Sequence, residues 1–562
     1  MGGWGIDVKR LRLGRRPVAA LALACILLVS GLGYLYYTEV GYRYFAETKV
    51  RKDMVGVLTV EGPVLSSLNA SGYTNIINQA LLNDSVKAVV LRVDSPGGYA
   101  DYIEQVYLDI LELKEKKPVV ASVVSALSGG YYISVAADYI YVHPASMVGD
   151  VGVIGEGPPT LIPSEIVMET GAYKITGFSK LLFPFNLTHA LDSFVSAVEA
   201  GRGGRLKLSS TQLRRGMIYF GSEAVAAGLA DEIGSLQKAV ERVASEAGLV
   251  EYDVVDLNQL FKASGPSVSS YNEMTVEWRD LTVETLNRLH PPPAVYHLYL
   301  PPRTLAPGVY TLDSTAEAEA VNVSAKKVER GAVLVDLSHG NRVSTWELDM
   351  LAAELAMRNR TLAFVETWDE VESAMGNASA LIVAAPTKPY SSEEGERIEE
   401  FVDDGRMLLM FFDPASEYLE IPALNGPINS LANRFGLHFA NGYLYNEEDH
   451  YGFYRNIYIR SFADSNLTRG LSSLVLFTAA HIRSNHGVAW TSSDTYSSTA
   501  ERSGNYTVIT WAVDNGTVAA FGDLTFLMEP YCYLEDNYRL VLNLVEAIAG
   551  VEVPIEAPHP AP

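Results

Sequence analysis

The stretch VVASVVSALSGGYY, residues 119–132, decides the fold of the first half of this chain. A β-branched apolar run is followed by Ser128, Gly129 and Gly130, and then by two tyrosines. Such a run favours a buried strand, and a Gly-Gly pair permits a tight turn. The stretch therefore predicts a strand, a turn and a helix start, which would hold the Ser128 hydroxyl clear of the sheet and beside backbone N–H groups.

Similar units surround this stretch from Val55 to about Leu249. Val55–Val60 and Ala88–Val93 are predicted to be buried strands, and Tyr99–Glu115 has apolar residues at helical spacing. Alternation of this kind is typical of an α/β domain with crossover connections. A second glycine loop, DSPGG at residues 94–98, follows the strand at 88–93. Parallel neighbouring strands would bring both loops together at their carboxyl ends.

Five segments together resemble the signal peptide peptidase A family, peptidase family S49, whose fold is shared with Clp proteases and crotonases. They are LRVDSPGG (91–98), SGGYY (128–132) with AAD (136–138), GDVGV (149–153), GAYK (171–174) and GLADEIG (228–234). The resemblance covers roughly residues 55–250.

The resemblance implies a serine peptidase without a metal or cofactor. Ser128 would be the nucleophile and Lys174 the general base. The backbones of Gly98 and Gly129 would be the oxyanion donors, with Gly97 as a less favoured one. The sequence departs from the family at Asp150, where a small hydroxyl residue is usual.

Lys174 can accept the serine proton only when it is neutral, and burial among apolar groups lowers a lysine pKa. Tyr173 and Ile175 flank it and would supply such groups. The alternatives are that Lys174 is an ordinary surface charge, that Lys180 is the base, or that His143 completes a Ser-His-Asp triad.

Assembly is the next expectation, because this chain holds one copy of a unit that longer family members hold twice. The resemblance implies a homo-oligomeric ring or dome with sites near subunit boundaries. Whether Lys174 serves the Ser128 of its own chain or of a neighbour stays open.

The N-terminal residues predict a membrane anchor. A basic cytoplasmic tail (1–16) precedes the uncharged run 17–37, about the 20 residues that a helix needs to cross a bilayer. Basic residues stay on the cytoplasmic side, so the catalytic domain is expected outside the cytoplasm. A cleaved signal peptide is the alternative. Nine glycosylation sequons fit an extracytoplasmic surface: Asn69, Asn83, Asn186, Asn322, Asn359, Asn377, Asn466, Asn505 and Asn515.

Composition excludes other classes of protein. A net charge of −24 over 562 residues argues against a nucleic-acid partner. Cys25 and Cys532 are the only cysteines, too few for a disulfide framework or a Cys-based metal site.

The remainder is predicted to form a second α/β domain. The peptidase domain (50–250) is followed by a proline-containing connector (251–330), a flavodoxin-like domain (331–550) and a Pro-rich tail (551–562). The predicted strands are Ala332–Leu337, Leu362–Glu366, Ala380–Ala385, Arg406–Phe412 and Val518–Phe521, and the predicted helices are Thr345–Arg358, Ser391–Val402 and Asn537–Ile548.

This second domain resembles glutamine-amidotransferase-like domains, but no cysteine stands at a nucleophile turn, so a binding or assembly module is expected. Four polar residues would fall at its strand ends: His339, Asn341, Asp413 and Asp523. Such residues more often cap helices and turns, so they are not assigned as a site.

The function predicted overall is a membrane-anchored serine endopeptidase that hydrolyses signal peptides or other membrane-derived apolar peptides outside the cytoplasm. One alternative is a catalytically inactive scaffold or binding protein at the cell surface. Another is a crotonase-type acyl-CoA enzyme, which the expected compartment disfavours because it lacks CoA substrates.

Overall fold

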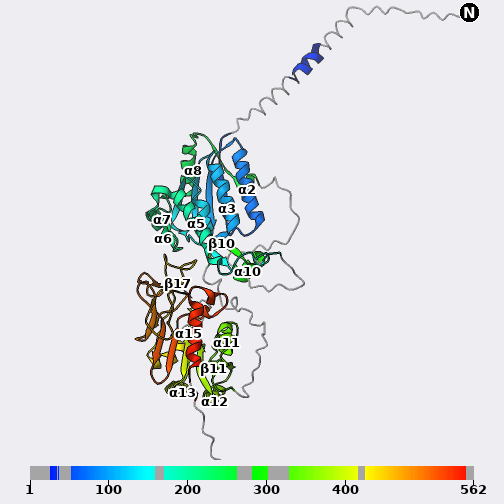
Figure 1. Cartoon of the computed structure of the whole chain (residues 1–562). Coiled ribbons are helices and arrows are strands. Elements are labelled where there is room, and N and C mark those ends of the chain that lie inside the picture. Colours follow the sequence, from blue (N-terminus) through cyan, green and yellow to red (C-terminus); the bar gives the residue numbers. More distant parts are fainter. Residues whose placement is uncertain are drawn as a thin grey trace, which may run out of the picture.

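The computed structural model describes residues 52–158, 170, 171, 173–261, 281–300, 328–414, 425–551 and 553, with 24, 26–34 and 36 near the N-terminus. Two bodies of sheet and helix follow one another along the chain (Figure 1). We call residues 52–300 the first domain and residues 328–553 the second domain.

The first domain is built on a sheet with the strand order β7-β5-β4-β2-β1-β9. Strands β9, β1, β2, β4 and β5 are parallel, β7 joins β5 antiparallel, and β8 joins β5 parallel. The strands are β1 (Met54–Glu61), β2 (Val86–Ser95), β4 (Val119–Leu127), β5 (Tyr139–Gly149), β7 (Ile218–Phe220), β8 (Glu232–Ile233) and β9 (Asp253–Asp256). Because β2 and β4 are neighbours, the two glycine loops lie side by side, as predicted.

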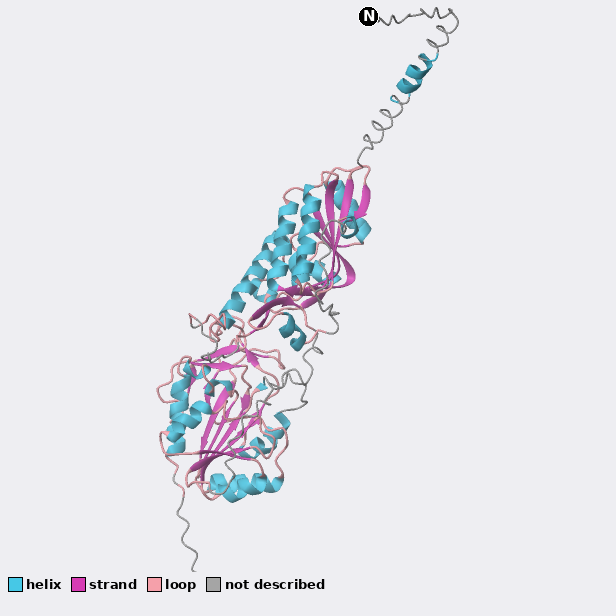
Figure 2. Cartoon of the chain, turned by 90° about the vertical axis from the view of Figure 1, so that its right-hand side faces the viewer, coloured by secondary structure: helices cyan, strands magenta, loops and turns pink. Residues whose placement is uncertain are grey.

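Helices cover both faces of this sheet (Figure 2). The main core lies on the face covered by α2 (Ser67–Leu82), α3 (Ala100–Lys114), α4 (Gly129–Ser134) and α5 (Phe183–Arg202). The opposite face packs on α8 (Leu236–Glu246). The shorter helices α6 (Ser210–Leu213), α7 (Gly221–Ala227) and α9 (Leu257–Leu260) also contribute buried residues to the main core. The strands predicted around 55–60, 88–93 and 118–124 and the helix at 99–115 are present.

A second, three-stranded sheet corrects the prediction for residues 251–330. Within that range β9 extends the main sheet, and β10 (Ala294–Leu298) lies between β3 (Gly97–Tyr99) and β6 (Ile154–Glu156). Helix α10 (Val283–Leu289) precedes β10. Part of the expected connector therefore belongs to the first domain. Such short strands beside a run of prolines carry little periodic signal, and their partners lie far away in the sequence.

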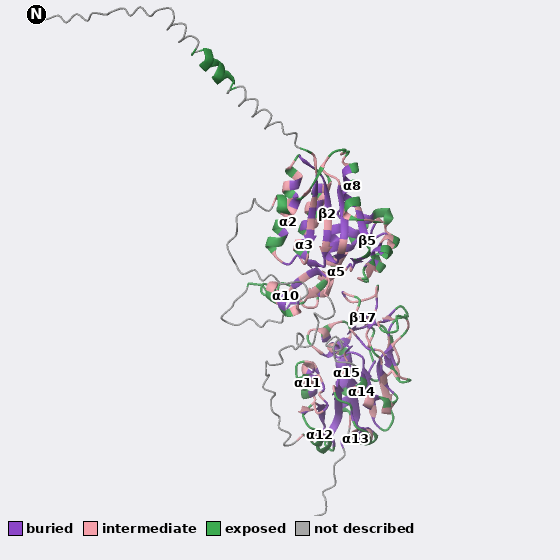
Figure 3. Cartoon of the chain, turned by 180° about the vertical axis from the view of Figure 1, so that it is seen from behind, coloured by how far each residue is buried: buried purple, intermediate pink, exposed green. Residues whose placement is uncertain are grey.

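The second domain contains an eight-stranded sheet in the order β12-β11-β13-β14-β24-β23-β21-β18. Its first five strands are parallel in the order 2-1-3-4-5, which is the flavodoxin-like order. They are β11 (Ala332–Asp336), β12 (Leu362–Val365), β13 (Ala378–Ala384), β14 (Met407–Phe411) and β24 (Thr517–Phe521). Most of their residues are buried (Figure 3).

Two hydrophobic clusters sandwich this sheet. One contains residues of α11 (Asp349–Ala356) and α15 (Asn537–Ala549), and the other those of α12 (Trp368–Met375), α13 (Ser392–Asp403) and α14 (Asn425–Ala432). Helix α11 is shorter than the predicted segment 345–358.

The segment between α14 and β24 contains strands that sequence periodicity did not predict. Strands β23 (Thr507–Val513), β21 (Gly487–Trp490) and β18 (Ser461–Phe462) continue the sheet antiparallel. Three further antiparallel pairs lie beside it: β15 (His438–Phe439) with β20 (Ile482–Arg483), β16 (Leu444–Tyr445) with β22 (Tyr496–Ser497), and β17 (Asn456–Ile459) with β19 (Leu474–Phe477).

The two domains contact each other where α5 and the turn between α6 and β7 meet the loop between β16 and β17. Arg215 makes two hydrogen bonds to the Glu447 carboxylate at 2.6 and 2.9 Å. The Phe185 ring packs edge-on against Tyr451, with ring centroids 4.9 Å apart. The Thr188 hydroxyl donates to the carbonyl oxygen of Gly452.

Within the described part of the chain, no helix combines the length and the apolar character that crossing a bilayer requires. Of the anchor predicted at 17–37, residues 24, 26–34 and 36 are described, and they are helical and exposed. The rest of that segment lies outside the described residues.

A buried ion pair holds the end of α5 to the rest of the first domain. The Arg202 guanidinium is fully buried and donates to both carboxylate oxygens of Asp231 at 2.9 and 2.7 Å, and its Nε donates to the Gly228 carbonyl at 2.8 Å. Asp231 also accepts from the Ile140 N–H at 2.7 Å. The pair therefore links α5, β5 and the 228–231 segment.

We expect Asp231→Ala to lower the free energy of unfolding by about 3–5 kcal/mol, because it leaves the Arg202 charge buried and unpaired. Asp253→Ala is the matched control, since its ion pair with Lys52 is about half exposed and should contribute less than about 1 kcal/mol. Urea denaturation of each variant measures the difference. Equal losses in the two variants would contradict the structural role of the buried pair.

Candidate active site

Ser128 stands between β4 and α4 in a strained backbone conformation. Its φ of 49° and ψ of −118° lie outside the regions that non-glycine residues favour. The Ser128 N–H donates to the Gly149 carbonyl at 2.9 Å, and its carbonyl accepts from the N–H groups of Tyr131 and Tyr132. Its hydroxyl makes no hydrogen bond to any residue that the structure describes. A strained turn that presents a serine hydroxyl is typical of a nucleophile.

The two glycine loops touch through their backbones. A Cβ on Gly130 would lie 2.3 Å from the Ser95 carbonyl oxygen, and one on Gly98 would lie 2.1 Å from the Val64 carbonyl oxygen. The Ser95 hydroxyl donates to the Gly62 carbonyl at 2.7 Å and accepts from the Gly97 N–H at 3.2 Å. Only glycine fits at Gly98 and Gly130, so the loops are held at fixed positions next to Ser128.

Gly97, Gly98 and Gly129 surround one carbonyl oxygen, that of His297 in β10. A Cβ on Gly97 would lie 1.9 Å from this oxygen, and one on Gly129 would lie 2.7 Å from it. Gly98 is paired with His297 in the antiparallel β3–β10 ladder. The three predicted oxyanion residues are thus brought together around a carbonyl group. Nothing in the sequence indicated that β10 would supply that group.

Lys174 lies on an exposed turn of the first domain. Its ammonium group makes no hydrogen bond or ion pair with any described residue, and Tyr173 and Ile175 are 57% and 40% exposed. The described residues of a single chain therefore do not supply the apolar surroundings that were expected for Lys174. Nearby, a Cβ on Gly177 would lie 3.3 Å from the Pro293 ring, which places this turn beside the start of β10.

The alternative bases lie in different surroundings. His143 is exposed on β5. Burial lowers the pKa of Lys180, and its ammonium lies 5.6 Å from the centre of the Tyr531 ring in the second domain. Lys180 therefore contacts the other domain.

Comparison with known proteins identifies the first domain. The model of peptidase family S49 matches residues 112–160, which include Ser128. A putative protease of Synechocystis is 32% identical over 210 residues, which is 33% of this chain and 75% of that protein. The chain belongs to peptidase family S49, a family of serine peptidases.

Another relative matches a similar share of this S49 chain. Protease 4 of Haemophilus influenzae is 34% identical over 212 residues, and the match spans only 34% of that protein's length. It covers 34% of this chain as well. A solved structure, the 1510-N membrane protease specific for a stomatin homolog from Pyrococcus horikoshii, is 17% identical over 35% of this chain and 79% of its own, with a TM-score of 0.23.

Asp150 is the residue at which the S49 motif departs from its usual sequence. It follows Gly149, the acceptor of the Ser128 N–H, and has a φ of 54°. Its N–H donates to the Met217 carbonyl at 3.0 Å. Burial raises the pKa of its carboxyl group to about 7. The backbone that holds Ser128 is therefore next to a carboxyl group that titrates near neutral pH.

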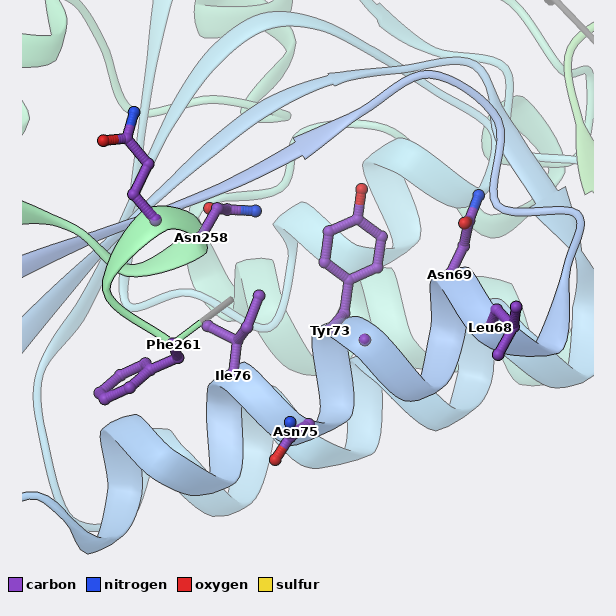
Figure 4. Close-up of a pocket in the computed structure, with 9 residues that line it drawn as sticks. Leu68, Asn69, Tyr73, Asn75, Ile76, Asn258 and Phe261 are labelled. Atoms are coloured by element: carbon purple, nitrogen blue, oxygen red, sulfur yellow. The ribbon is translucent and has the colours of Figure 1, made fainter. Parts of the chain in front are cut away.

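A separate cavity lies between α2 and α9, away from Ser128 (Figure 4). Its volume is about 530 Å³. Its lining residues are Leu68, Asn69, Gly72, Tyr73, Asn75, Ile76, Asn258, Gln259 and Phe261. None belongs to the glycine loops or to β10.

In the second domain, His339 and Asn341 surround the buried carboxylate of Asp336. Asp336 lies 2.9 Å from His339 Nδ1 and accepts hydrogen bonds from Ser338, Asn341 and Tyr390. Burial favours a raised pKa at Asp336, but the hydrogen bonds from His339, Ser338 and Tyr390 outweigh it and lower that pKa. The side-chain amide oxygen of Asn341 accepts a hydrogen bond from the Ala384 N–H at 2.6 Å. These contacts join β11 to β13.

Asp413 and Asp523 form a second polar group, at the ends of β14 and β24. Burial, together with the charge of Asp413, raises the pKa of Asp523 to about 8. The Asp523 carboxyl also accepts from the N–H groups of Phe477 and Thr525 at 2.9 and 2.8 Å. The four polar residues singled out in the sequence thus form two groups with neighbours of their own.

We expect Asp150→Asn to stabilise the chain increasingly as pH rises. The folded protein keeps the Asp150 proton up to about pH 7, whereas the unfolded chain loses it near pH 4, so wild-type stability falls across this interval and levels off above it. Asp150→Asn removes this loss, up to about 4 kcal/mol. Chemical denaturation between about pH 4 and pH 8 measures it, with exposed Glu251→Gln as the control. A pH-independent difference from wild type would refute the assignment.

Proposed function

We propose that this S49 chain is a membrane-anchored serine endopeptidase that uses Ser128 and Lys174 to hydrolyse signal peptides or other apolar peptides outside the cytoplasm. The observation that carries the proposal is the position of Ser128. Its unpaired hydroxyl stands on a strained turn beside the two glycine loops, and these loops already surround a carbonyl oxygen. That arrangement suits acyl transfer to a serine.

The proposed reaction has two stages. Neutral Lys174 takes the proton of the Ser128 hydroxyl while the oxygen attacks the substrate carbonyl carbon, and the backbones of Gly98 and Gly129 stabilise the oxyanion. The C–N bond then breaks, and the lysine proton goes to the leaving amine. In the second stage water, deprotonated by Lys174, hydrolyses the ester and releases Ser128.

Assembly of several chains is part of the proposal, because an exposed lysine is charged and is no base near neutral pH. Lys174, Tyr173 and Ile175 form an exposed patch in the single chain. A neighbouring subunit that covers this patch would desolvate the ammonium and lower its pKa. We therefore propose a homo-oligomer in which Lys174 acts at a subunit boundary.

The anchoring segment is proposed from the sequence and from the described helix residues within it. Ile26, Leu27, Leu28 and Val29 are each more than 60% exposed. Exposed aliphatic side chains on one uncharged helix favour insertion into lipid. The basic residues before position 17 then place the S49 domain on the opposite side of the membrane from the cytoplasm.

We expect Ser128→Ala and Lys174→Ala each to lower kcat for cleavage of an apolar peptide by about a thousandfold or more, because each removes a group that bonds to the reacting atoms or takes their proton. Lys180→Ala is the matched control and should keep most of the activity. The assay follows cleavage of a fluorogenic apolar peptide by the purified full chain. Full activity of either Ser128→Ala or Lys174→Ala would refute the dyad.

Mixing the two inactive variants tests where Lys174 acts. If Lys174 serves the Ser128 of a neighbour, assemblies that contain both variants regain part of the wild-type activity, because some boundaries combine an intact serine with an intact lysine. No recovery, with mixed assemblies demonstrated by differential tags, would place the lysine at the serine of its own chain. Labelling of Ser128 by a fluorophosphonate without any peptide cleavage would favour the inactive scaffold instead.

Removal of residues 1–51 should release the chain from the membrane fraction without abolishing peptide cleavage, because the segment lies outside the described S49 domain. Sedimentation of membranes from cells that produce each form measures the distribution. A truncated chain that still sediments with membranes would contradict the proposed anchor.

A further inference from the structure

Strand β10 occupies a position between two segments of the S49 domain. It is antiparallel to both β3 and β6, with Tyr296 opposite Tyr99 on one side and opposite Ile154 on the other. β3 continues the DSPGG loop, and β6 directly follows the GDVGV segment. An extended peptide that pairs on both sides in this way fulfils the hydrogen bonds of two strand edges.

The carbonyl group of His297 points at the glycine loops. The Tyr299 N–H donates to the Pro96 carbonyl at 2.8 Å. Hydrogen-bonded pairs alternate along an antiparallel ladder, so His297 and Gly98 form the next such pair, and the Gly98 N–H faces the His297 oxygen. As the Cβ distances at Gly97 and Gly129 indicate, the same oxygen lies against both loops. In the proposed mechanism, in which Gly98 and Gly129 stabilise the oxyanion, the carbonyl group of the scissile peptide bond would take the same position.

The His297 side chain fills a site made for a flat ring. It is fully buried and packs edge-on against Tyr132 and Phe194, with ring centroids 5.1 Å away in each case. Its Nδ1 lies 3.3 Å from the Gly152 carbonyl oxygen. Its Nε2 has no hydrogen-bond partner among the described residues, and Glu104 is 3.8 Å away. Tyr132 and Phe194 stack on each other 4.5 Å apart, which shapes an aromatic ring site.

The opposite face of β10 packs on a small cluster of its own. Tyr296 and Leu298 contact Leu65, Leu281 and Leu286 in a cluster that is separate from the main core of the first domain. On this face β10 therefore contributes nothing to the main core, and its contact with that core is the His297 ring against Tyr132 and Phe194.

We propose that β10 is an internal pseudosubstrate. The position between β3 and β6 binds an extended peptide as an antiparallel strand, and the ring site of Tyr132 and Phe194 accepts an aromatic side chain on the acyl side of the scissile bond. β10 fills this position until a substrate peptide displaces it. The proposal rests on the proposed peptidase function, because it assigns the substrate position of the same site.

Two substitutions at His297 test the pseudosubstrate proposal, because they are expected to change kcat/KM in opposite directions. His297→Ala empties the ring site and weakens β10 docking, so kcat/KM for an added peptide should rise about tenfold. His297→Phe fills the site without an unpartnered buried nitrogen, so docking tightens and kcat/KM should fall about fivefold. Thermal unfolding establishes that both variants fold. The same change in both variants, or none in either, would overturn the proposal.

Peptide binding gives a readout that does not need catalysis. In the Ser128→Ala background, a fluorescent peptide with the sequence of residues 293–299, PAVYHLY, should bind more tightly to the His297→Ala chain than to the His297→Phe chain. A peptide with Phe in place of His should bind more tightly than PAVYHLY itself. Equal affinity of the two peptides would overturn the assignment of the ring site.

A reversible cross-link tests the strand itself. Ala294 and Glu156 are opposite each other in the β10–β6 ladder, so Ala294→Cys with Glu156→Cys should form a disulfide that locks β10 in place. Oxidation should abolish cleavage of the added peptide, and reduction should restore it. The activity of a variant with only one of the two substitutions should not change on oxidation. Full activity of the oxidised double variant would show that substrates bind elsewhere.

Failure of this inference and failure of the proposed function give different results. If cleavage depends on Ser128 but is unchanged in the His297 variants and in the cross-linked chain, the pseudosubstrate proposal is refuted and the peptidase proposal is supported. If the peptides bind in the expected order of affinity but no variant cleaves a peptide, the binding position of β10 is supported and the peptidase proposal is refuted.

Discussion

Ser95 in β2 lies opposite Ala126 in β4, and this parallel pairing brings the DSPGG loop and the Ser128 turn together at the carboxyl ends of the two strands. The two loops then approach so closely that a side chain at Gly97 or Gly130 would collide with backbone atoms of the other loop. Close packing of backbone on backbone fixes the N–H groups in space before any substrate arrives. The positive φ at Ser128 persists because the helix α4 and the Gly149 carbonyl hold the residue on both sides.

The same edge leaves backbone groups of β3 and β6 that need partners, and β10 provides them. A strand edge can accept a segment of its own chain or a peptide from elsewhere, since both offer the same backbone groups. A tethered segment has a high effective concentration at the site, so it occupies the edge by default. The unpartnered Nε2 of His297 limits how tightly this segment binds. A high effective concentration combined with a limited affinity suits a strand that a substrate peptide has to displace.

The two ionisable groups Asp150 and Lys174 differ in how far they are buried. The Asp150 carboxyl, next to the residue that accepts the Ser128 N–H, is protonated in the folded chain below about pH 7 because of desolvation. Lys174, by contrast, is exposed, and its ammonium group has no hydrogen-bond or ion-pair partner among the described residues of a single chain. In the proposed mechanism Lys174 has to be neutral, and a neighbouring subunit that covers it would supply apolar surroundings, which connects the chemistry to assembly.

The resemblance of five segments to peptidase family S49 was sufficient to indicate the family from the sequence. Periodicity and turn residues, which act over a few neighbouring positions, indicated the strands β1, β2 and β4 and the helix α3. The expected parallel order of neighbouring strands predicted that the two glycine loops meet. The sequence also indicated the five parallel strands of the second domain. The short antiparallel strands between 438 and 513 escaped prediction, since two-residue strands carry no periodic signal.

Only the tertiary structure decided the surroundings of the site. β10 lies in a proline-containing segment that looked like a connector, and its partners Gly98 and Gly155 are well over a hundred residues away in the sequence. Which nitrogen of His297 lacks a partner and how far Lys174 is exposed also depend on packing between distant segments. The sequence determined which residues could do the chemistry, whereas long-range strand pairing and burial decided which of them share a site and what already occupies it.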